Sequence, residues 1–282
     1  MAEKHDPVSP NNSTDRMEEN PWTYAAVQTQ GGNPVRSKKT KGKRIIAWLA
    51  LALSLCIIAV AGYQLWSVQQ AYQQGDNAYE KLSVLVRPAE PEPDTDIPAL
   101  DIDFAALKAI NPDTAAWLYC PDTVINYPVM QAKDYDYYLR RLPDGTYNLN
   151  GTLFIDYNNP ADFSEALTVV YGHHMKSGKM FGSLVGYKQQ DYYDKHPAMY
   201  LYTEEGGCKI DLLYGFVVGA RQWRERAFMY EANLESLLTY AAGETTFTGT
   251  AVYTPGDRIV ALSTCSYEFD NARYVVLGVL RP

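Results

Sequence analysis

The fold follows from a C-terminal stretch, Asp257-Arg258-Ile259-Val260-Ala261-Leu262-Ser263-Thr264-Cys265, and from the segment soon after it, Ala272-Arg273-Tyr274-Val275-Val276-Leu277-Gly278-Val279-Leu280. Both are rich in β-branched and aliphatic residues, and the polar residues 266–271 can close a hairpin, so we predict two antiparallel strands. Cys265 then ends one strand and Arg273 begins the next, and residues that flank a hairpin loop face each other. A thiol beside a fixed positive charge has a lowered pKa, and the thiolate is the nucleophilic form. The stretch therefore predicts a candidate thiol site at the end of a hairpin.

Short apolar segments and turn residues alternate through the rest of the C-terminal part. We predict strands at about 115–120, 124–130, 151–156, 167–172, 198–203, 208–220, 257–265 and 273–280. Apolar faces predict helices at 178–185 and 231–242, the second between the sixth and seventh strands. Asp103 is placed to cap a short helix that buries three apolar residues, Phe104, Leu107 and Ile110. So many strands predict a mainly β fold, a closed or nearly closed barrel with flanking helices.

The N-terminal part is organised differently. Residues 1–44 are polar and show no apolar period, which predicts a disordered cytoplasmic tail. Residues 45–66 carry no charge, have aromatic residues near both ends, and are long enough to cross roughly 30 Å of hydrocarbon. Lys and Arg cluster before this run and none follows until Lys81. The positive-inside rule therefore predicts a single-pass anchor in the cell membrane, with everything after Trp66 outside.

A cleaved signal peptide is the alternative, because Ala59-Val60-Ala61 has the form of a cleavage site. The apolar run is long and its preceding region extended for a signal peptide, so an uncleaved anchor is favoured. We predict a juxtamembrane helix and an acidic, Pro-rich spacer over 67–99, because such composition is stiff and extended. An extracellular domain is predicted over 100–282.

The net charge and the cysteine content limit the classes of function that this chain can have. A net charge of -8 and a pI near 5.1 argue against a nucleic-acid partner, because phosphate binding needs a basic face. Of the four cysteines, Cys56 lies in the apolar run, and the remaining three are Cys120, Cys208 and Cys265. An odd number leaves a free thiol unless it pairs between chains. A free thiol outside the cell is open to oxidation, so keeping one indicates that it is used.

A base for this thiol is sought among the histidines. His173 and His174 follow a predicted strand that ends in Gly172, whereas His196 precedes a proline in a polar turn. Adjacent residues on a strand point to opposite faces, so one of the pair can face the thiol, and spacing alone does not decide which.

Simpler interpretations compete with a catalytic site. A cysteine at a strand end is most often a small buried hydrophobe. The two histidines could cap a turn or join an acid in binding a metal, although no spacing resembles a structural zinc site. Arg273 could pair with Glu268 or Asp270 on the surface. Three other arginines compete as the cationic partner of the thiol: Arg221, Arg224 and Arg226.

The motifs together resemble those of the sortases, membrane-anchored cysteine transpeptidases of Gram-positive bacteria. The likeness rests on Leu262-Ser263-Thr264-Cys265, Arg273 and Tyr171-Gly172-His173. It is closer to the class B sortases and runs from about Phe104 to the end. The further motifs, in order, are Ile110-Asn111-Pro112-Asp113, Ile125-Asn126-Tyr127-Pro128-Val129, Asp136-Tyr137-Tyr138-Leu139, Phe154-Ile155-Asp156-Tyr157 and Gly172-His173-His174-Met175.

The resemblance implies a closed eight-stranded sortase-type β-barrel and a triad of Cys265, His173 and Arg273, with His173 chosen because it directly follows the glycine. It also implies that Ser263 and Thr264 lie beside the peptide groove and contact substrate. The implied enzyme, of the cysteine-type peptidase class, cleaves a C-terminal sorting signal after Thr through a thioester. It then transfers the surface protein to a peptidoglycan amine. No metal or organic cofactor is implied.

Other functions remain open from the sequence. Some class B members carry an acid directly after the cysteine where this chain has Ser266, which makes the substrate preference less certain than the reaction. The class suggests a signal of the Asn-Pro-x-Thr or Ser/Pro-Pro-x-Thr type. A hydrolytic peptidase on the same site, an inactive barrel that acts as a binding module, and a pilus polymerase are the alternatives. The segment before residue 115 shows no lid motif of the kind associated with pilus polymerisation.

Overall fold

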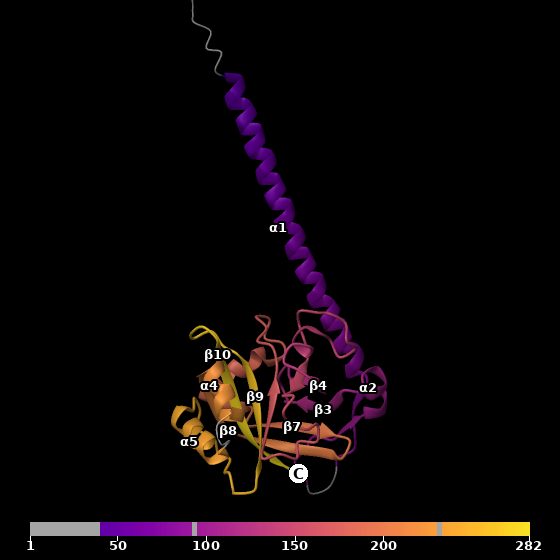
Figure 1. The fold of residues 1–282 in the computed structure, drawn as a ribbon. Helices are drawn as coiled ribbons and strands as arrows, with labels where there is room; N and C mark the ends of the chain where they lie inside the picture. The colour runs from indigo at the N-terminus through magenta and orange to yellow at the C-terminus, as the bar shows by residue number, and fades with distance from the viewer. Residues whose placement is uncertain (1–39, 92–94, 230–232) are drawn as a thin grey trace, which may run out of the picture. The chain divides into compact units, whose positions relative to one another are not determined.

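The computed structural model describes residues 40–91, 95–229 and 233–282 (Figure 1). By its contacts the chain divides into two units, 1–57 and 58–282. Helix α1 (Thr40–Ser83) begins in the first and ends in the second. The predicted disordered tail lies outside the described residues except for 40–44, which are helical.

Helix α1 carries the predicted apolar run. Within the described part of the chain it is the one helix long and apolar enough to cross a membrane, and its most apolar window has a mean hydropathy of 2.6. The large hydrophobic side chains from Ile45 to Trp66 are exposed. Exposure of so many apolar groups on one helix is consistent with a single membrane span.

Eight strands close into a barrel, as predicted. They are β3 (Thr114–Tyr119), β4 (Asn126–Gln131), β5 (Leu153–Ile155), β6 (Leu167–Tyr171), β7 (Ala198–Thr203), β8 (Gly206–Gly219), β9 (Arg258–Cys265) and β10 (Ala272–Arg281). Their order around the barrel is β10-β8-β7-β3-β4-β5-β6-β9. The β4–β5 and β6–β9 pairs are parallel, and the other pairs are antiparallel.

The continuous apolar character of β9 and β10 reflects burial on both faces. On β9, Val260 and Leu262 belong to the main core cluster, whereas Ile259 and Ala261 belong to a second cluster. That second cluster contains residues of α4 (Ala220–Arg224) and α5 (Leu234–Glu244), the helices beside β8, β9 and β10 in Figure 1. A strand covered on both faces reads as an unbroken hydrophobic run because neither set of alternating side chains meets water.

The remaining helices are partly as expected. Helix α5 lies between the sixth and seventh barrel strands, as predicted, although residues 231 and 232 of the expected helix fall outside the described residues. The segment expected to be a helix at 178–185 is the 3-10 helix η2 (Phe181–Lys188), followed by α3 (Gln190–Lys195). Helix α4, the π-helical segment η3 (Glu225–Met229) and the 3-10 turn η1 (Tyr138–Arg140) had no clear sequence signal.

Helix α2 (Phe104–Ile110) begins where the sequence predicted. The Asp103 carboxylate accepts a hydrogen bond from the Ala106 amide at 2.8 Å. Phe104 and Leu107 are buried, but the prediction for Ile110 was wrong, because its side chain is 46% exposed. Ile110 is the last residue of the helix.

The segment before the barrel folds back on it. Strand β1 (Val86–Pro88) pairs with β2 (Leu100–Ile102), and these strands flank a third core cluster that contains Leu82 and Trp117. The described residues on either side of 92–94 therefore meet at one strand pair, and burying their apolar side chains favours the paired form.

Candidate active site

The parallel pairing of β6 with β9 brings two strand ends together. Tyr171 lies opposite Ser263, and the Gly172 amide donates to the Ser263 carbonyl at 3.2 Å. Carboxyl ends of parallel strands meet at the same edge. His173, two residues beyond β6, therefore lies at the level of Cys265, the last residue of β9.

The hairpin of β9 and β10 adds the guanidinium. Arg273 is paired directly with Cys265, as the spacing predicted, and the Ser266 amide donates to the Ala272 carbonyl at 2.9 Å. Arg273 Nη1 donates to the Ala272 carbonyl at 3.0 Å. Among the described carboxylates none pairs with Arg273, and Glu268 pairs with Lys188 instead. The surface ion pair considered for Arg273 is therefore not formed.

One pocket of 280 Å³ contains all five residues singled out in the sequence. The complete lining is Tyr135, Asp136, Leu139, Phe154, Tyr171, Gly172, His173, Ala220, Trp223, Arg224, Ser263, Thr264, Cys265 and Arg273. A thiol, an imidazole and a guanidinium thus share one cavity. This is the set of groups needed for acyl transfer through a thioester.

The His173 imidazole is held against η1. Its Nε2 forms a hydrogen bond with the Leu139 carbonyl. Burial lowers the pKa of His173; the Leu139 hydrogen bond opposes this shift, and the charge of Arg140 adds to it. At pH 7 the ring is therefore mainly neutral and able to accept a proton.

Gly172 allows His173 to sit at this place. A Cβ at residue 172 would lie 2.6 Å from Phe181 Cδ2 and would overlap Leu153 Cδ2. Both neighbours are fully buried, so neither can move aside. The close approach of the backbone to these two side chains explains a glycine before the histidine.

His174 has a different environment from His173. Its Nδ1 donates to the Cys265 carbonyl at 2.7 Å, and its ring lies 4.9 Å from that of Tyr267. It fixes the end of β9 from outside the pocket. The structure thus gives the two histidines, which spacing alone left equivalent, separate surroundings.

Ser263 and Thr264 are both buried and line the pocket, but their hydroxyls differ. The Thr264 hydroxyl donates to the Gly172 carbonyl at 2.8 Å, a bond that holds β9 to the end of β6. The Ser263 hydroxyl has no partner among the described residues. Of the two, only Ser263 keeps its hydroxyl uncommitted.

The segment after the nucleophile is tied to η2. Lys188 Nζ donates to the Ser266 hydroxyl at 3.0 Å, and both residues bond to Glu268. Burial alone raises the pKa of Glu268, but the hydrogen bonds from Lys188 and Ser266 outweigh it and lower the pKa to about 2. A carboxylate therefore lies beside Ser266, the residue directly after the candidate nucleophile.

Three further residues line the pocket, Tyr135, Trp223 and Arg224, of which the sequence indicated only Arg224. Arg224 lies over the Tyr135 ring, with Cζ 5.0 Å from its centroid, and Trp223 is buried with no partner for its indole N–H among the described residues. Arg224 had been considered only as a competitor of Arg273. Trp223 follows β8 in a segment without strong periodicity, and its nearness to the thiol depends on the pairing of β8 with β10. Within the described ranges, no group of three or more His, Cys, Asp or Glu residues could hold a metal ion.

Comparison with known proteins gives a consistent result. Sortase B of Listeria monocytogenes is 30% identical over 177 residues, which cover 62% of this chain and 72% of that protein. Sortase B of Clostridium perfringens matches with a TM-score of 0.59 and 28% identity, covering 64% of this chain and 100% of that one. A Bacillus anthracis protein similar to sortase B matches at a TM-score of 0.59 and 32% identity, covering 74% and 93%. No protein-family model matches the sequence.

Three further similar structures either contain a bound molecule or belong to a protein with a known biological role. A Staphylococcus aureus sortase B–substrate complex matches with a TM-score of 0.58 and 27% identity, covering 63% of this chain and 83% of that one. A sortase B complexed with triglycine matches with a TM-score of 0.57 and 26% identity, covering 63% and 84%. A Streptococcus pyogenes class B sortase involved in pilus biogenesis matches with a TM-score of 0.58 and 27% identity, covering 64% and 98%.

Proposed function

Because this chain belongs to the class B sortases, which are cysteine transpeptidases, we propose that it cleaves the C-terminal sorting signal of surface proteins after Thr and transfers them to a peptidoglycan amine. The observation that carries this proposal is the shared pocket of Cys265, His173 and Arg273. Under the same proposal the chain acts as a peptidase-class enzyme when water replaces the amine.

The proposed first step forms the thioester. His173 accepts the proton of the Cys265 thiol, and the thiolate sulfur attacks the Thr carbonyl carbon. The oxyanion of the tetrahedral intermediate is stabilised by the Arg273 guanidinium. The carbon–nitrogen bond then breaks, and the proton passes from His173 to the departing amine.

The second step releases the product. The acceptor amine attacks the thioester carbonyl, loses a proton to His173, and displaces the Cys265 sulfur. The lowered pKa of His173 supports both steps, because a neutral imidazole at pH 7 can take a proton in each. The proton then passes from His173 to the displaced sulfur, which restores the Cys265 thiol and the neutral imidazole.

The proposed setting is the outer face of the cell membrane. Residues 45–66 would span the bilayer, residues 1–44 would lie in the cytoplasm, and residues 100–282 would form the catalytic domain beyond the 67–99 segment. The exposed apolar part of α1 supports this arrangement. Such an anchor would keep the site where cell-wall precursors are joined.

The proposed substrate is a peptide with an Asn-Pro-x-Thr or Ser/Pro-Pro-x-Thr signal. The substrate complex of the Staphylococcus aureus relative and the triglycine complex of a sortase B support a peptide donor and an amine acceptor. The uncommitted Ser263 hydroxyl is the group we propose to contact the bound peptide. Thr264 would act through the backbone of the groove, because its hydroxyl is bound to Gly172.

The test uses the full-length chain in detergent micelles with a set of fluorogenic sorting-signal peptides, with and without triglycine. Cleavage after Thr that requires Cys265, with product joined to the amine, is the expected result. One control is Cys265→Ala, which should lose turnover. The other is a matched pair of histidine variants: His173→Ala should lose turnover, and His174→Ala should keep it. Cleavage without any amine product would favour the hydrolytic peptidase, and no cleavage of any peptide would favour the inactive barrel.

Pilus assembly is a second candidate, since one solved class B relative takes part in pilus biogenesis. The two functions differ in the acceptor, which is a protein lysine in polymerisation and a cell-wall precursor amine in anchoring. Offering both acceptors to the thioester in one reaction distinguishes them. Preferential transfer to the protein lysine would replace the proposed anchoring role.

A further inference from the structure

We propose that the turn of α1 from Gly75 to Tyr79 positions the imidazole of His173, with Tyr79 as the principal positioning residue. The inference rests on the proposed function in that it takes His173 to be the catalytic base. The part of α1 that follows the proposed membrane span would then contribute to catalysis as well as to anchoring. Two chains of contacts leave this turn and end at His173.

The first chain begins at the Tyr79 hydroxyl, which donates to the Gly151 carbonyl and lies 3.1 Å from Thr152 Oγ1. Burial raises the pKa of Tyr79 far above its ordinary value, so the hydroxyl stays protonated as a donor. Gly151 lies directly against the imidazole, because a Cβ at residue 151 would be 2.9 Å from His173 Cδ2. Only one residue therefore separates Tyr79 from the His173 ring.

The same loop supplies the hydrogen-bond partner of the ring. The 138–152 loop contains the Leu139 carbonyl, which is bonded to His173 Nε2, and a Cβ at Gly151 would lie 2.6 Å from that oxygen. The two ends of the loop are tied by a hydrogen bond from the Thr152 amide to the Tyr138 carbonyl at 2.9 Å. Displacing Gly151 would thus move the acceptor of the His173 ring as well.

Helix α1 also holds the loop beside Gly151. Asn148 Nδ2 donates to the Ala71 carbonyl at 2.7 Å. The backbones approach closely at Gly75, where a Cβ would overlap the Asn150 amide and lie 3.2 Å from Asn148 Oδ1. Asn150 is 1% exposed, so its side chain has no room to move aside. The missing side chain at Gly75 lets the helix reach the loop.

The second chain runs on the other side of His173. Asp76 forms an ion pair with Lys179 at 2.5 Å, and the nearby Phe181 amide donates to the His173 carbonyl at 3.0 Å. Both charged side chains are about 40% exposed, so this pair contributes little free energy. The contact of Tyr79, whose side chain is partly buried against the main core cluster, is therefore the stronger of the two.

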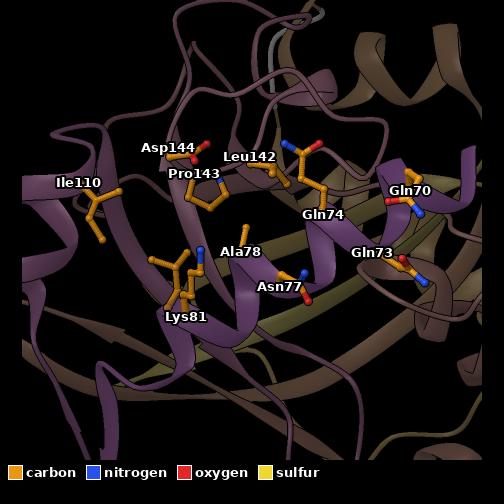
Figure 2. Close-up of a pocket in the computed structure, with 11 residues that line it drawn as sticks. Gln70, Gln73, Gln74, Asn77, Ala78, Lys81, Ile110, Leu142, Pro143 and Asp144 are labelled. Carbon is orange, nitrogen blue, oxygen red and sulfur yellow. The ribbon is translucent and has the colours of Figure 1, made fainter. Parts of the chain in front are cut away.

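A cavity lies between α1 and the tip of the same loop. Figure 2 shows Gln74, Ala78 and Lys81 of α1 facing the tip of the loop at Leu142–Asp144 across a cavity. The cavity measures 420 Å³.

The test compares Tyr79→Phe with Tyr72→Phe in the full-length chain in micelles. Tyr79→Phe removes the hydroxyl but keeps the ring beside Tyr127, 5.2 Å away. Tyr72 lies on the same helix and is 37% exposed, so its variant is the matched control. Peptide turnover gives kcat and KM, and NMR of ¹³C-labelled histidine follows the titration of His173. The melting temperatures of both variants are measured, so that the assays are run well below the temperature at which either protein unfolds.

We expect Tyr79→Phe to lower kcat roughly 10-fold with KM changed less than about twofold, because misplacing a catalytic group affects chemistry more than binding. The pKa of His173 should rise toward its ordinary value as water reaches the loosened ring. Tyr72→Phe should change neither. A Tyr79→Phe protein with the kcat and His173 titration of the control would overturn the proposal, and so would a rise in KM alone.

The titration is read without substrate, so it separates this inference from the proposed function. A shifted His173 titration in Tyr79→Phe, in a protein that cleaves no peptide, would support the positioning contact and refute the enzyme. If the unaltered chain turned over peptide and His173 titrated identically in both variants, the proposed enzyme would be supported and the positioning contact refuted.

Discussion

Replacing Gly172 by Ala tests whether close packing before His173 sets the catalytic geometry. The new methyl would gain about 0.8 kcal/mol by burial. It would also overlap Leu153 and lie 2.6 Å from Phe181 Cδ2, where both side chains are fully buried. Overpacking of this kind costs about 1–3 kcal/mol. We therefore expect a net loss of about 0.2–2 kcal/mol in the free energy of unfolding.

The same change should affect catalysis more than stability. A loss of about 0.2–2 kcal/mol lowers the melting temperature by up to about 8 °C for a domain of this size. His173 directly follows the altered residue, and a displacement of about 1 Å at a catalytic group can cost about 100-fold in rate. We expect kcat to fall by about 10- to 100-fold at a temperature where the variant is folded.

The assay is thermal unfolding followed by circular dichroism, together with peptide turnover. Gly243→Ala is the control, because nothing lies within 4 Å of its Cβ and it sits in α5. That variant should gain about 0.5–1 kcal/mol from helix propensity and keep its turnover. If Gly172→Ala were as stable and as active as Gly243→Ala, the packing argument would be refuted.

Two further changes probe the charged groups around the nucleophile. Arg273→Lys should lose most of its turnover while keeping the fold, because a point charge cannot reproduce the planar guanidinium; near-normal kcat would remove Arg273 from the triad. Glu268→Gln should destabilise the protein by up to about 1 kcal/mol at pH 7, a figure reduced because the Glu268 side chain is 38% exposed. The pKa of Glu268 lies below its ordinary value of 4.5, so this contribution is present above pH 4.5 and is lost as the pH falls toward 2. Urea unfolding at pH 7 and at pH 3 should show the difference between the two proteins shrinking at the lower pH, and a constant difference would contradict the ion pair with Lys188.

The sequence by itself determined the local structure of the barrel. Apolar, β-branched segments and the turn residues between them located all eight strands to within a few residues, because strand propensity and turn residues act over short windows. The hairpin prediction also placed Arg273 opposite Cys265, since only a short turn joins them. The charge-free run at 45–66 was visible for the same reason: length and composition alone define a candidate span.

The tertiary structure alone decided which distant residues meet. Spacing could not separate His173 from His174, and only the parallel pairing of β6 with β9 places one in the pocket and the other on the Cys265 carbonyl. The packing of the C-terminal turns of α1 on the 138–152 loop was equally hidden. Non-local pairings of this kind depend on closing the whole barrel and burying its surfaces together, so no single window of sequence contains them.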